Sequence, residues 1–215
     1  MHPALWISKT GLDAQQLDVS VISHNLANVN TVGFKRGRAV FTDLFYQKLS
    51  QPGGQSSQNT QLPTGVMLGT GVRTVATEKL FTGGSVVETK NSLDVAINGR
   101  GFFEVLRPDG TQAYTRDGQF HLDSSGQIVT SNGYVVQPAI TIPQNAQSVT
   151  ISVDGLVSVL SAGESAPSTV GTLQLADFIN PGGLEPVGDG LYVETASSGS
   201  AQTGQPGSTG LGTVT

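Results

Sequence analysis

Few side chains of this sequence could bind a metal or a cofactor, and they do not cluster. The three histidines, His2, His24 and His121, lie far apart along the chain, whereas a zinc site needs ligands that come together. The sequence has no cysteine, so it has no thiolate ligand, no disulfide and no cysteine nucleophile. We therefore expect neither a metal nor a cofactor.

Three aspartates are candidates for a carboxylate pair or a calcium site. Asp109 and Asp117 each precede a glycine, and Asp123 begins the string Asp-Ser-Ser-Gly. In such strings an aspartate usually bonds to its own backbone and favours a tight turn. The prediction is that these carboxylates stabilise turns and do no chemistry.

Complete motifs for phosphate binding or for a nucleophilic serine are also missing. The segment Gly99–Gly101 begins like a phosphate-binding loop, but Glu104 stands where the third glycine would be. There is no Gly-Lys-Ser/Thr string, and Gly199–Ser200 is not part of a Gly-x-Ser-x-Gly elbow. We therefore expect that the protein is not an enzyme.

The charge balance argues against nucleic acid as a partner. The formal net charge is −5 at pH 7, whereas phosphates attract Lys and Arg. One short basic cluster, Lys35, Arg36 and Arg38, is too small for a nucleic-acid surface. We expect this cluster to be solvated or to form salt bridges between subunits.

The sequence gives two alternatives for the protein's location. No run approaches the roughly 20 apolar residues of a membrane-spanning helix, so no direct membrane insertion is predicted. The N-terminal segment lacks the basic start and the continuous apolar stretch of a cleavable signal peptide. The protein is therefore either cytoplasmic or exported by a route that needs no such peptide.

Residues from about 4 to 29 are predicted to form a helix. The apolar residues that recur at heptad spacing, with a 3-4 alternation in the second half, are Leu5, Leu12, Val19, Ile22, Leu26 and Val29. Leu17 and Val21 are expected to widen this stripe. The stripe packs either on the helix's own domain or on another subunit. We favour an intermolecular contact, because no later segment offers a helical partner.

The helix is expected to end in a run of residues that tolerate left-handed backbone, which are Asn25, Asn28, Asn30 and Gly33. After it, residues Ala39–Leu49 could make a second short helix. The residues on one side of that helix would be Phe41, Leu44, Phe45 and Lys48. The polar stretch 51–65 is predicted to be a loop or an extended arm, because it is rich in Gly, Pro and Gln.

From about residue 66 the pattern changes to short strands. Four Asp-Gly pairs give tight-turn signals, at Asp109–Gly110, Asp117–Gly118, Asp154–Gly155 and Asp189–Gly190. Their spacing predicts a twisted all-β domain over about 85–195. The predicted fold is therefore mainly β with an N-terminal α-helix, comprising an assembly helix (1–35), a connecting segment (36–84), the β domain (85–195) and a flexible Gly/Ser/Thr tail (196–215).

Several strings resemble the signature of the flagellar basal-body rod and hook family. They are Thr10–Leu12, Asn25–Lys35, Asp94–Phe103, Tyr114–Phe120 and Val136–Pro138. Within that family, Tyr46–Ser57 and Leu62–Gly65 resemble the insertion of the distal rod branch, which proximal rod and hook proteins lack. The resemblance implies a rod-specific arm that includes Tyr46, Gln51, Pro52, Gly53, Leu62 and Pro63.

The resemblance implies a structural function and a set of partners. Subunits of this family leave the cell through the flagellar type III export apparatus and stack helically in the periplasm. The distal rod joins the proximal rod proteins to the hook protein and turns inside the P ring and L ring, which act as a bushing. Residues implied in the inner tube are Leu5, Leu12, Val19, Ile22 and Leu26, while Asn25 and Asn28 either bond between helices or only cap.

One departure and two alternatives accompany this interpretation. Family members end in a second long helix that pairs with the N-terminal one, whereas this sequence ends in a Gly/Ser/Thr-rich segment. A secreted β-rich binding module, such as an adhesin fragment, would suit the Gly-rich strands but would leave the heptads unexplained. A hydrolase of β architecture would need a catalytic pair, and none is found in the sequence.

Overall fold

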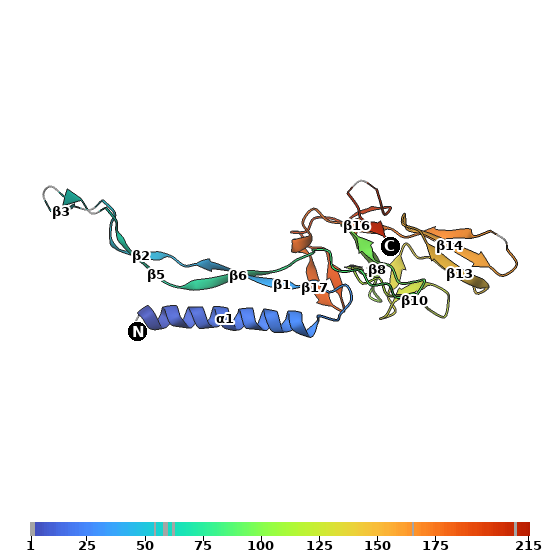
Figure 1. Ribbon diagram of the computed structural model, residues 1–215, viewed down its shortest axis with the longest axis horizontal. Coiled ribbons are helices and arrows are strands. Elements are labelled where there is room, and N and C mark those ends of the chain that lie inside the picture. The colour runs from blue at the N-terminus through green and yellow to red at the C-terminus, as the bar shows by residue number, and fades with distance from the viewer. Residues whose placement is uncertain (1–2, 54, 58–59, 62, 165, 209) are drawn as a thin grey trace. The chain divides into compact units, whose positions relative to one another are not determined.

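A computed structural model describes residues 3–53, 55–57, 60–61, 63–164, 166–208 and 210–215 (Figure 1). The chain divides into two compact units. The first, here called the helix–ribbon unit, comprises Met1–Val29 and Arg36–Leu80. The second, the β unit, comprises Asn30–Lys35 and Phe81–Thr215. The described part is mainly β with one N-terminal α-helix, which confirms the predicted fold class.

The N-terminal helix, α1, extends over Pro3–Ala27, close to the predicted range. Pro3 suits the start of a helix, where its missing N–H would have no partner in any case. Ala14 is the buried residue of the described helix. A helix of 25 residues with so little burial draws little stability from its own chain, because helices in water depend on packing for most of their stability.

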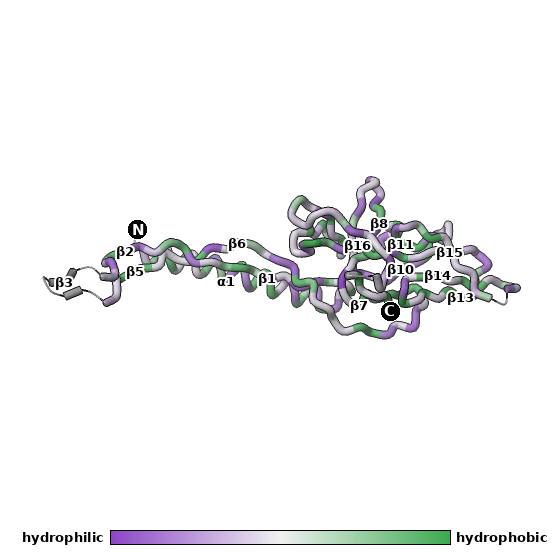
Figure 2. The backbone as a smooth tube through the Cα atoms, turned by 90° about the horizontal axis from the view of Figure 1, so that it is seen from above, coloured by the Kyte–Doolittle hydropathy of each residue, from purple (hydrophilic) through white to green (hydrophobic). Residues whose placement is uncertain are grey.

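The rest of the helix–ribbon unit is a ribbon of paired antiparallel strands. β1 (Gly37–Asp43) pairs with β6 (Val72–Lys79), and β2 (Tyr46–Ser50) pairs with β5 (Val66–Gly69). Further along, β3 (Gln55–Ser57) pairs with β4 (Thr60–Gln61). Within this unit α1 lies alongside β1 and β6, and Figure 2 shows hydrophobic and hydrophilic positions mixed along all three elements.

The ribbon corrects one prediction. Residues Ala39–Leu49 do not form a second helix, because most of them lie in β1 and β2. The spacing of Phe41, Leu44 and Phe45 fits a helix locally, but short apolar runs suit either structure. Pairing with Val72–Lys79, some 35 residues further on, decides in favour of strands.

The β unit is built around a nine-stranded sheet in which β8 is central. The strands follow the order β10-β11-β12-β8-β9-β18-β17, and β16 pairs with both β8 and β19. The bounds of these strands are β8 (Phe102–Leu106), β9 (Gln112–Thr115), β10 (Phe120–Leu122), β11 (Ile128–Thr130), β12 (Val135–Gln137), β16 (Leu175–Asp177), β17 (Glu185–Gly188), β18 (Leu191–Val193) and β19 (Gln202–Gly204).

Two smaller sheets and a single helical turn complete this unit. The three-stranded sheet has the order β13-β14-β15, and a two-stranded sheet joins β7 to β20. The bounds are β7 (Ile97–Asn98), β13 (Ala146–Ile151), β14 (Leu156–Ser161), β15 (Ser168–Thr172), β20 (Thr213–Val214) and the 3-10 turn η1 (Pro181–Gly183).

The hydrophobic core lies in the β unit and has two parts. The larger part contains fully buried side chains from all three sheets, among them Phe103, Val105, Phe120, Val157, Leu173 and Val214. The smaller part is aromatic, and edge-to-face contacts join Phe102 to Phe178 and Tyr114 to Phe178. Alternation along β8 divides the two parts, because Phe102 and Phe103 point to opposite faces of the sheet.

The predicted flexible tail over 196–215 is wrong in this structure. β19 pairs with β16, β20 pairs with β7, and Val214 is only 1% exposed. The segment is too polar to fold alone, but it needs no core of its own when earlier strands supply its hydrogen-bond partners. The β unit therefore extends to residue 215, beyond the predicted boundary of 195.

Candidate assembly interface

Helix α1 carries an apolar seam that the described residues of its own chain leave exposed. The exposed fractions of the seam residues are Leu5 67%, Leu12 71%, Val19 60%, Ile22 56% and Leu26 70%. Large apolar side chains at heptad spacing are typical of a helix that packs against another helix. The structure thus brings the five predicted apolar residues together on one side of α1, where a second chain can reach them.

A different face of the same helix packs on the ribbon. Ala14 is buried, and Leu17 and Val21 are half-buried. Leu12 lies two positions before Ala14, and Val19 lies two positions before Val21. Two residues rotate a helix by about 200°, so the seam and the buried face point in different directions. Leu17 and Val21 therefore do not widen the seam, as the sequence suggested, but belong to the intrachain face.

Asn25 fixes the C-terminal part of α1 to the ribbon. Its side-chain amide donates to the Gly37 carbonyl oxygen at 2.8 Å and its oxygen accepts from the Gly37 N–H at 2.8 Å. The Asn28 amide instead donates to the His24 carbonyl oxygen at 2.9 Å, within the helix end. These two predicted interface residues thus have intrachain hydrogen bonds.

Thr10 makes the corresponding contact near the other end of the helix. Its hydroxyl donates to the Ile7 carbonyl oxygen at 2.8 Å and accepts from the Val72 N–H at 3.4 Å. Gly71, with φ of 125°, lies so close that an added β carbon would be 2.3 Å from the Thr10 hydroxyl oxygen. A glycine at position 71 is therefore required by both backbone conformation and space.

The two contacts match because helix and strand have compatible lengths. Thr10 and Asn25 are 15 residues apart, which is roughly 22 Å along a helix. Their partners lie at opposite ends of the β1–β6 pair, since Asp43 pairs with Val72 and Gly37 with Lys79. Six steps along a strand cover roughly 20 Å. The ribbon is thus long enough to hold α1 at both contacts.

The predicted arm over about 46–65 forms the part of the ribbon that extends beyond β1 and β6. Tyr46 is 57% exposed, and its ring lies over Gly69, its partner across β2 and β5. A hydrogen bond to Asp43 raises the pKa of the Tyr46 hydroxyl. Apolar residues exposed along β2 and β5 or just before them are Phe45, Leu49, Val66, Met67 and Leu68. This surface has no cover in the described part of the chain.

The other predicted arm residues lie near the tip. Gln51, Pro52 and Gly53 are exposed after β2, and Gly53 has the φ of 79° that the third position of a type II turn requires. Pro63 is exposed before β5. Leu62 lies outside the described residues.

Three of the strings that carried the family resemblance meet inside the β unit. An added β carbon at Gly33 would be 2.7 Å from the Asp117 backbone nitrogen, and one at Gly118 would be 1.7 Å from the Val95 carbonyl oxygen. The Val95 N–H also donates to the Gly118 carbonyl oxygen at 3.0 Å. Gly118 is therefore a close packing contact, not part of the tight turn that was predicted, whereas the Asp117 carboxylate does accept from nearby backbone, the Gln119 N–H at 3.1 Å. These motif residues bring backbone segments into close contact.

Arg116 stabilises the same part of the β unit, where these motif strings meet. Its guanidinium donates to the carbonyl oxygens of Gly101 at 2.9 Å and Gly99 at 2.7 Å, and it lies 5.2 Å from the Phe102 ring centre. Burial lowers the pKa of Arg116. Burial, and then the charge of Arg116, also lower the pKa of Lys35, whose amine donates to the Thr82 carbonyl oxygen at 2.7 Å.

The basic cluster and the candidate carboxylates serve local structure. Arg38 forms an ion pair with Glu78 across the ribbon. The Asp109 carboxylate accepts from the Thr111 N–H at 2.9 Å, and that of Asp123 accepts from the Ser125 N–H at 2.6 Å. Both carboxylates thus bond to nearby backbone, as predicted. Among the described residues, no group of three or more His, Cys, Asp or Glu side chains is placed to hold a metal ion.

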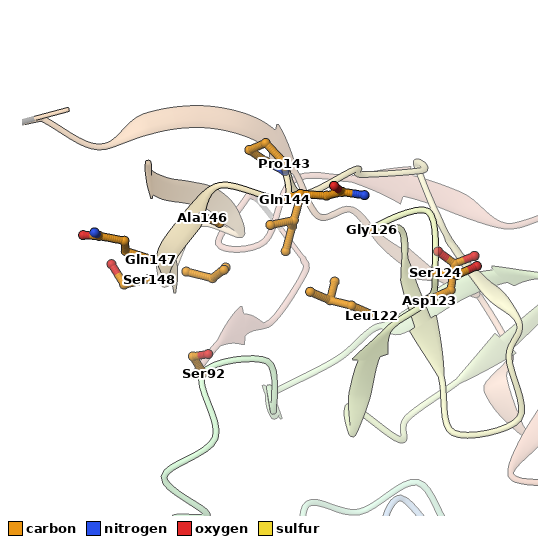
Figure 3. Close-up of a pocket in the computed structure, with 12 residues that line it drawn as sticks. Ser92, Leu122, Asp123, Ser124, Gly126, Pro143, Gln144, Ala146, Gln147 and Ser148 are labelled. Atoms are coloured by element: carbon orange, nitrogen blue, oxygen red, sulfur yellow. The ribbon is translucent and has the colours of Figure 1, made fainter. Parts of the chain in front are cut away.

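A shallow pocket of about 380 Å³ lies beside β10 in the β unit. Figure 3 shows Asp123 and Ser124 at one end, Gln147 and Ser148 at the other, and Leu122 between them. The Asp123 carboxylate is already bonded within its turn, so the pocket offers no free reactive group from that residue. Separately, none of the helices in the described residues is long and apolar enough to cross a membrane.

Comparison with known families identifies this arrangement. Residues 6–35, which include most of α1, match the family described as flagella basal body rod protein. Residues 96–159 match the D1 domain of the flagellar hook proteins FlgE/F/G. The helix and the first half of the β unit therefore both have the sequence pattern of flagellar rod and hook proteins.

Individual relatives narrow the family. The flagellar basal-body rod protein FlgG of Buchnera aphidicola subsp. Schizaphis graminum is 55% identical over 99% of this chain and 82% of its own length. FlgG of Caulobacter vibrioides is 51% identical over 97% of this chain and 80% of its own length. The flagellar hook protein FlgE of Helicobacter mustelae is 44% identical over 64% of this chain and 30% of its own length. The chain belongs to the FlgG family of flagellar basal-body rod proteins, and it is a structural subunit of the rod.

Proposed function

We propose that this rod subunit polymerises through the apolar seam of α1 into the helical shaft of the distal rod. The observation that carries the proposal is the exposure of all five seam residues, at 56–71%. Fully burying such a side chain stabilises an interface by about 1.5–3 kcal/mol. Five of them on each subunit supply a sizeable contact, and repetition along a polymer turns modest contacts into a stiff shaft.

The arm is proposed to pack against neighbouring subunits. Phe45 is 90% exposed, and Leu49 and Val66 are 63% and 55% exposed. A two-stranded ribbon is marginally stable by itself in water, so β2 and β5 gain stability when a neighbour covers their apolar side chains. Such packing would resist bending of the assembled shaft.

The family and the sequence features support a location and a set of partners for this function. We assign the subunit to the basal body within the periplasm, reached through the flagellar type III export apparatus. Its neighbours would be further copies of itself, the proximal rod proteins and the hook protein, with the P ring and L ring around the shaft. The role is mechanical, and the proposed mechanism includes no catalytic step.

A single substitution in the seam tests the proposal. Leu12→Asp places a charge where the assembled subunit would bury an apolar side chain, and a buried charge without a partner is costly. The control is Ser20→Asp, which adds the same charge at an exposed helix position off the seam. We expect Leu12→Asp to abolish filaments in electron micrographs of the concentrated full chain and to abolish motility in cells, while Ser20→Asp leaves both intact.

The same experiment separates assembly from folding. Leu12 is 71% exposed, so its replacement leaves the monomer's packing unchanged. Amide exchange and thermal melting of the β unit should therefore be the same in the two variants and in the parent. Normal motility of Leu12→Asp would remove the seam from the mechanism.

A further inference from the structure

The β unit has a second pocket, of about 420 Å³, with an acidic lining. Its two carboxylates are Glu104 in β8 and Glu194 just after β18, and Tyr114 in β9 lies between these strands in the sheet. The amide side chains of Gln137 and Gln174 also line this pocket. We call this the acidic pocket.

The hydroxyl group of Tyr114 lacks a partner and faces this pocket. Tyr114 is 2% exposed, and its ring packs edge-to-face on Phe178 with ring centres 4.8 Å apart. Within the described residues its hydroxyl forms no hydrogen bond, and it is not among the buried polar atoms without a partner, so it is open to the pocket. Burial and the charges of Glu104 and Glu194 raise the pKa of Tyr114 to about 12. The hydroxyl is therefore neutral at physiological pH and near both carboxylates.

The two carboxylates also lack a compensating charge. Among the described side chains, neither Glu104 nor Glu194 lies within ion-pair distance of a Lys or Arg. Glu194 accepts one hydrogen bond, from the Ala201 N–H at 3.3 Å. Partial burial removes water from the Glu104 carboxylate and raises its pKa. A bound cation would relieve this cost, because an opposite charge nearby favours the ionised carboxylate.

The chemistry of the lining selects an organic cation. Among the described residues, no group of three or more His, Cys, Asp or Glu side chains is placed here to hold a metal ion. A sugar would need an exposed aromatic face for stacking, but the Tyr114 ring is buried. Carboxylates, amide oxygens and a phenol together accept the several N–H donors of an ammonium or guanidinium group.

The distribution of charge along the chain indicates where that cation comes from. The helix–ribbon unit carries six Lys or Arg and four Asp or Glu, a net charge of +2. The β unit carries five Lys or Arg and twelve Asp or Glu, a net charge of −7. Units of opposite charge on one chain favour a contact between unlike surfaces of two copies, and contacts of that kind generate open helical polymers where the rotation between copies does not close into a ring.

We propose that the acidic pocket receives a Lys or Arg side chain from the helix–ribbon unit of a second copy of this chain. Exposed basic residues of that unit without an ion pair among the described residues are Lys9, Arg36, Lys48 and Arg73. The inference rests on the proposed self-assembly and adds to it a second, polar contact that fixes the register of neighbouring subunits.

The test compares two double variants of equal charge. Glu104→Gln with Glu194→Gln removes both carboxylates of the pocket, whereas Glu164→Gln with Glu185→Gln removes two exposed carboxylates of the same unit elsewhere. We expect the pocket variant to raise the concentration needed for assembly by about tenfold and to weaken its salt dependence. The control should change it by less than about twofold, as exposed charges do. Equal effects of the two variants would overturn the proposal.

A second measurement tests ligand binding by the acidic pocket independently of assembly. N-acetyl-arginine amide and N-acetyl-lysine amide are titrated into the Leu12→Asp chain, and the Tyr114 ring signals are followed by NMR. Saturable shifts that vanish in the pocket variant support the site, and absence of shifts rejects it. Failure of the parent chain to assemble, with these shifts intact, would instead reject the proposed function alone. Single substitutions then identify the donor, as the variant that weakens assembly as much as the pocket variant does. They are Lys9→Gln, Arg36→Gln, Lys48→Gln and Arg73→Gln.

Discussion

Asn25 pairs with Gly37 through two hydrogen bonds of 2.8 Å, one to the backbone N–H and one to the carbonyl oxygen. A helix side chain thus takes the role that a neighbouring strand would have at the start of β1. The predicted interface residue therefore holds α1 on its own ribbon. The apolar seam, on another face of the helix, is left available for other subunits.

Asn25→Ala is expected to loosen the ribbon without affecting the β unit. Both backbone groups of Gly37 lose their partner, and because the site is part-buried we expect a loss of about 1–2 kcal/mol in local stability. Amide exchange at Gly37 and along β1 measures the effect. Asn25→Asp keeps the acceptor for the N–H but turns a carboxylate oxygen toward the Gly37 carbonyl oxygen, and it should lose at least as much. Unchanged exchange in Asn25→Ala would show that water replaces the amide.

Gly71→Ala should detach the N-terminal part of α1. The new β carbon would meet the Thr10 hydroxyl at 2.3 Å, and a φ of 125° is unfavourable for alanine, so we expect a cost of about 1–3 kcal/mol. Gly11→Ala is the contrasting variant, because nothing lies within 4 Å of its added carbon. Alanine there should stabilise the helix of the unassembled chain by about 1 kcal/mol. Helix content on thermal melting distinguishes the two.

Gly118→Ala is expected to prevent the β unit from folding stably. Its β carbon would lie 1.7 Å from the Val95 carbonyl oxygen, and both groups are backbone, so neither can rotate away. Gly133→Ala serves as the control, because it has φ of 83° but open space around it. It should cost only the left-handed penalty of about 1–2 kcal/mol. Denaturant unfolding followed through the tyrosines measures both, and similar midpoints would contradict the prediction.

We predict that the ionisation of Glu104 makes the stability of the β unit depend on pH. Burial raises the pKa of Glu104 above its ordinary value of 4.5. The contribution of this group to folding is therefore fully present below the ordinary pKa and is lost as the pH rises through the raised pKa. Tyr114 and Glu194 face the same pocket, and the phenol stays neutral throughout this range.

Glu104→Gln should consequently gain stability over the parent as the pH rises from about 4 to 7, because the amide never ionises. Urea midpoints at a series of pH values test this in the Leu12→Asp background, where assembly does not interfere. Glu185→Gln is the control for loss of a carboxylate outside the pocket. A constant difference between Glu104→Gln and the parent at every pH would refute the assignment.

Shortening the arm should soften the shaft. Because Ser50 pairs with Val66, residues Gln51–Gly65 can be replaced by Asn-Gly, which closes two antiparallel strands in a two-residue turn. We expect assembly to continue and the rods to bend, as measured in cryo-electron micrographs of isolated basal bodies. A Gly/Ser segment of the original length tests whether length alone suffices. Straight rods from both variants would show that the arm is not needed for stiffness.

Local patterns predicted some parts of the molecule well. The heptad spacing from Leu5 to Leu26 predicted both the helix and the exposure of its seam, because a 3.6-residue period is a property of consecutive residues. Three of the four Asp-Gly pairs are turns with a left-handed glycine, at Gly110, Gly155 and Gly190. These signals need no information about distant residues.

Pairings between distant segments were not predictable in this way. Ala39–Leu49 was predicted to be a helix because its apolar spacing is ambiguous, and the deciding partner lies at Val72–Lys79. The C-terminal strands were missed because Gln202–Gly204 and Thr213–Val214 contain one large apolar side chain between them. Asn25 was interpreted as an interface residue or a helix cap, and Gly118 as part of a turn, since nothing in the local sequence identifies Gly37 or Val95 as their partners.

The two anchors of α1, Thr10 at one end of the β1–β6 pair and Asn25 at the other, have a mechanical consequence. A rod held at one point pivots, whereas a rod clamped at two points roughly 22 Å apart can turn only if both clamps yield together. A sideways force on the seam is therefore divided between both clamps, and the lever arm between them reduces the load on each. We therefore expect a rotation of the helix to be transmitted to the ribbon, because both contacts hold the two elements together.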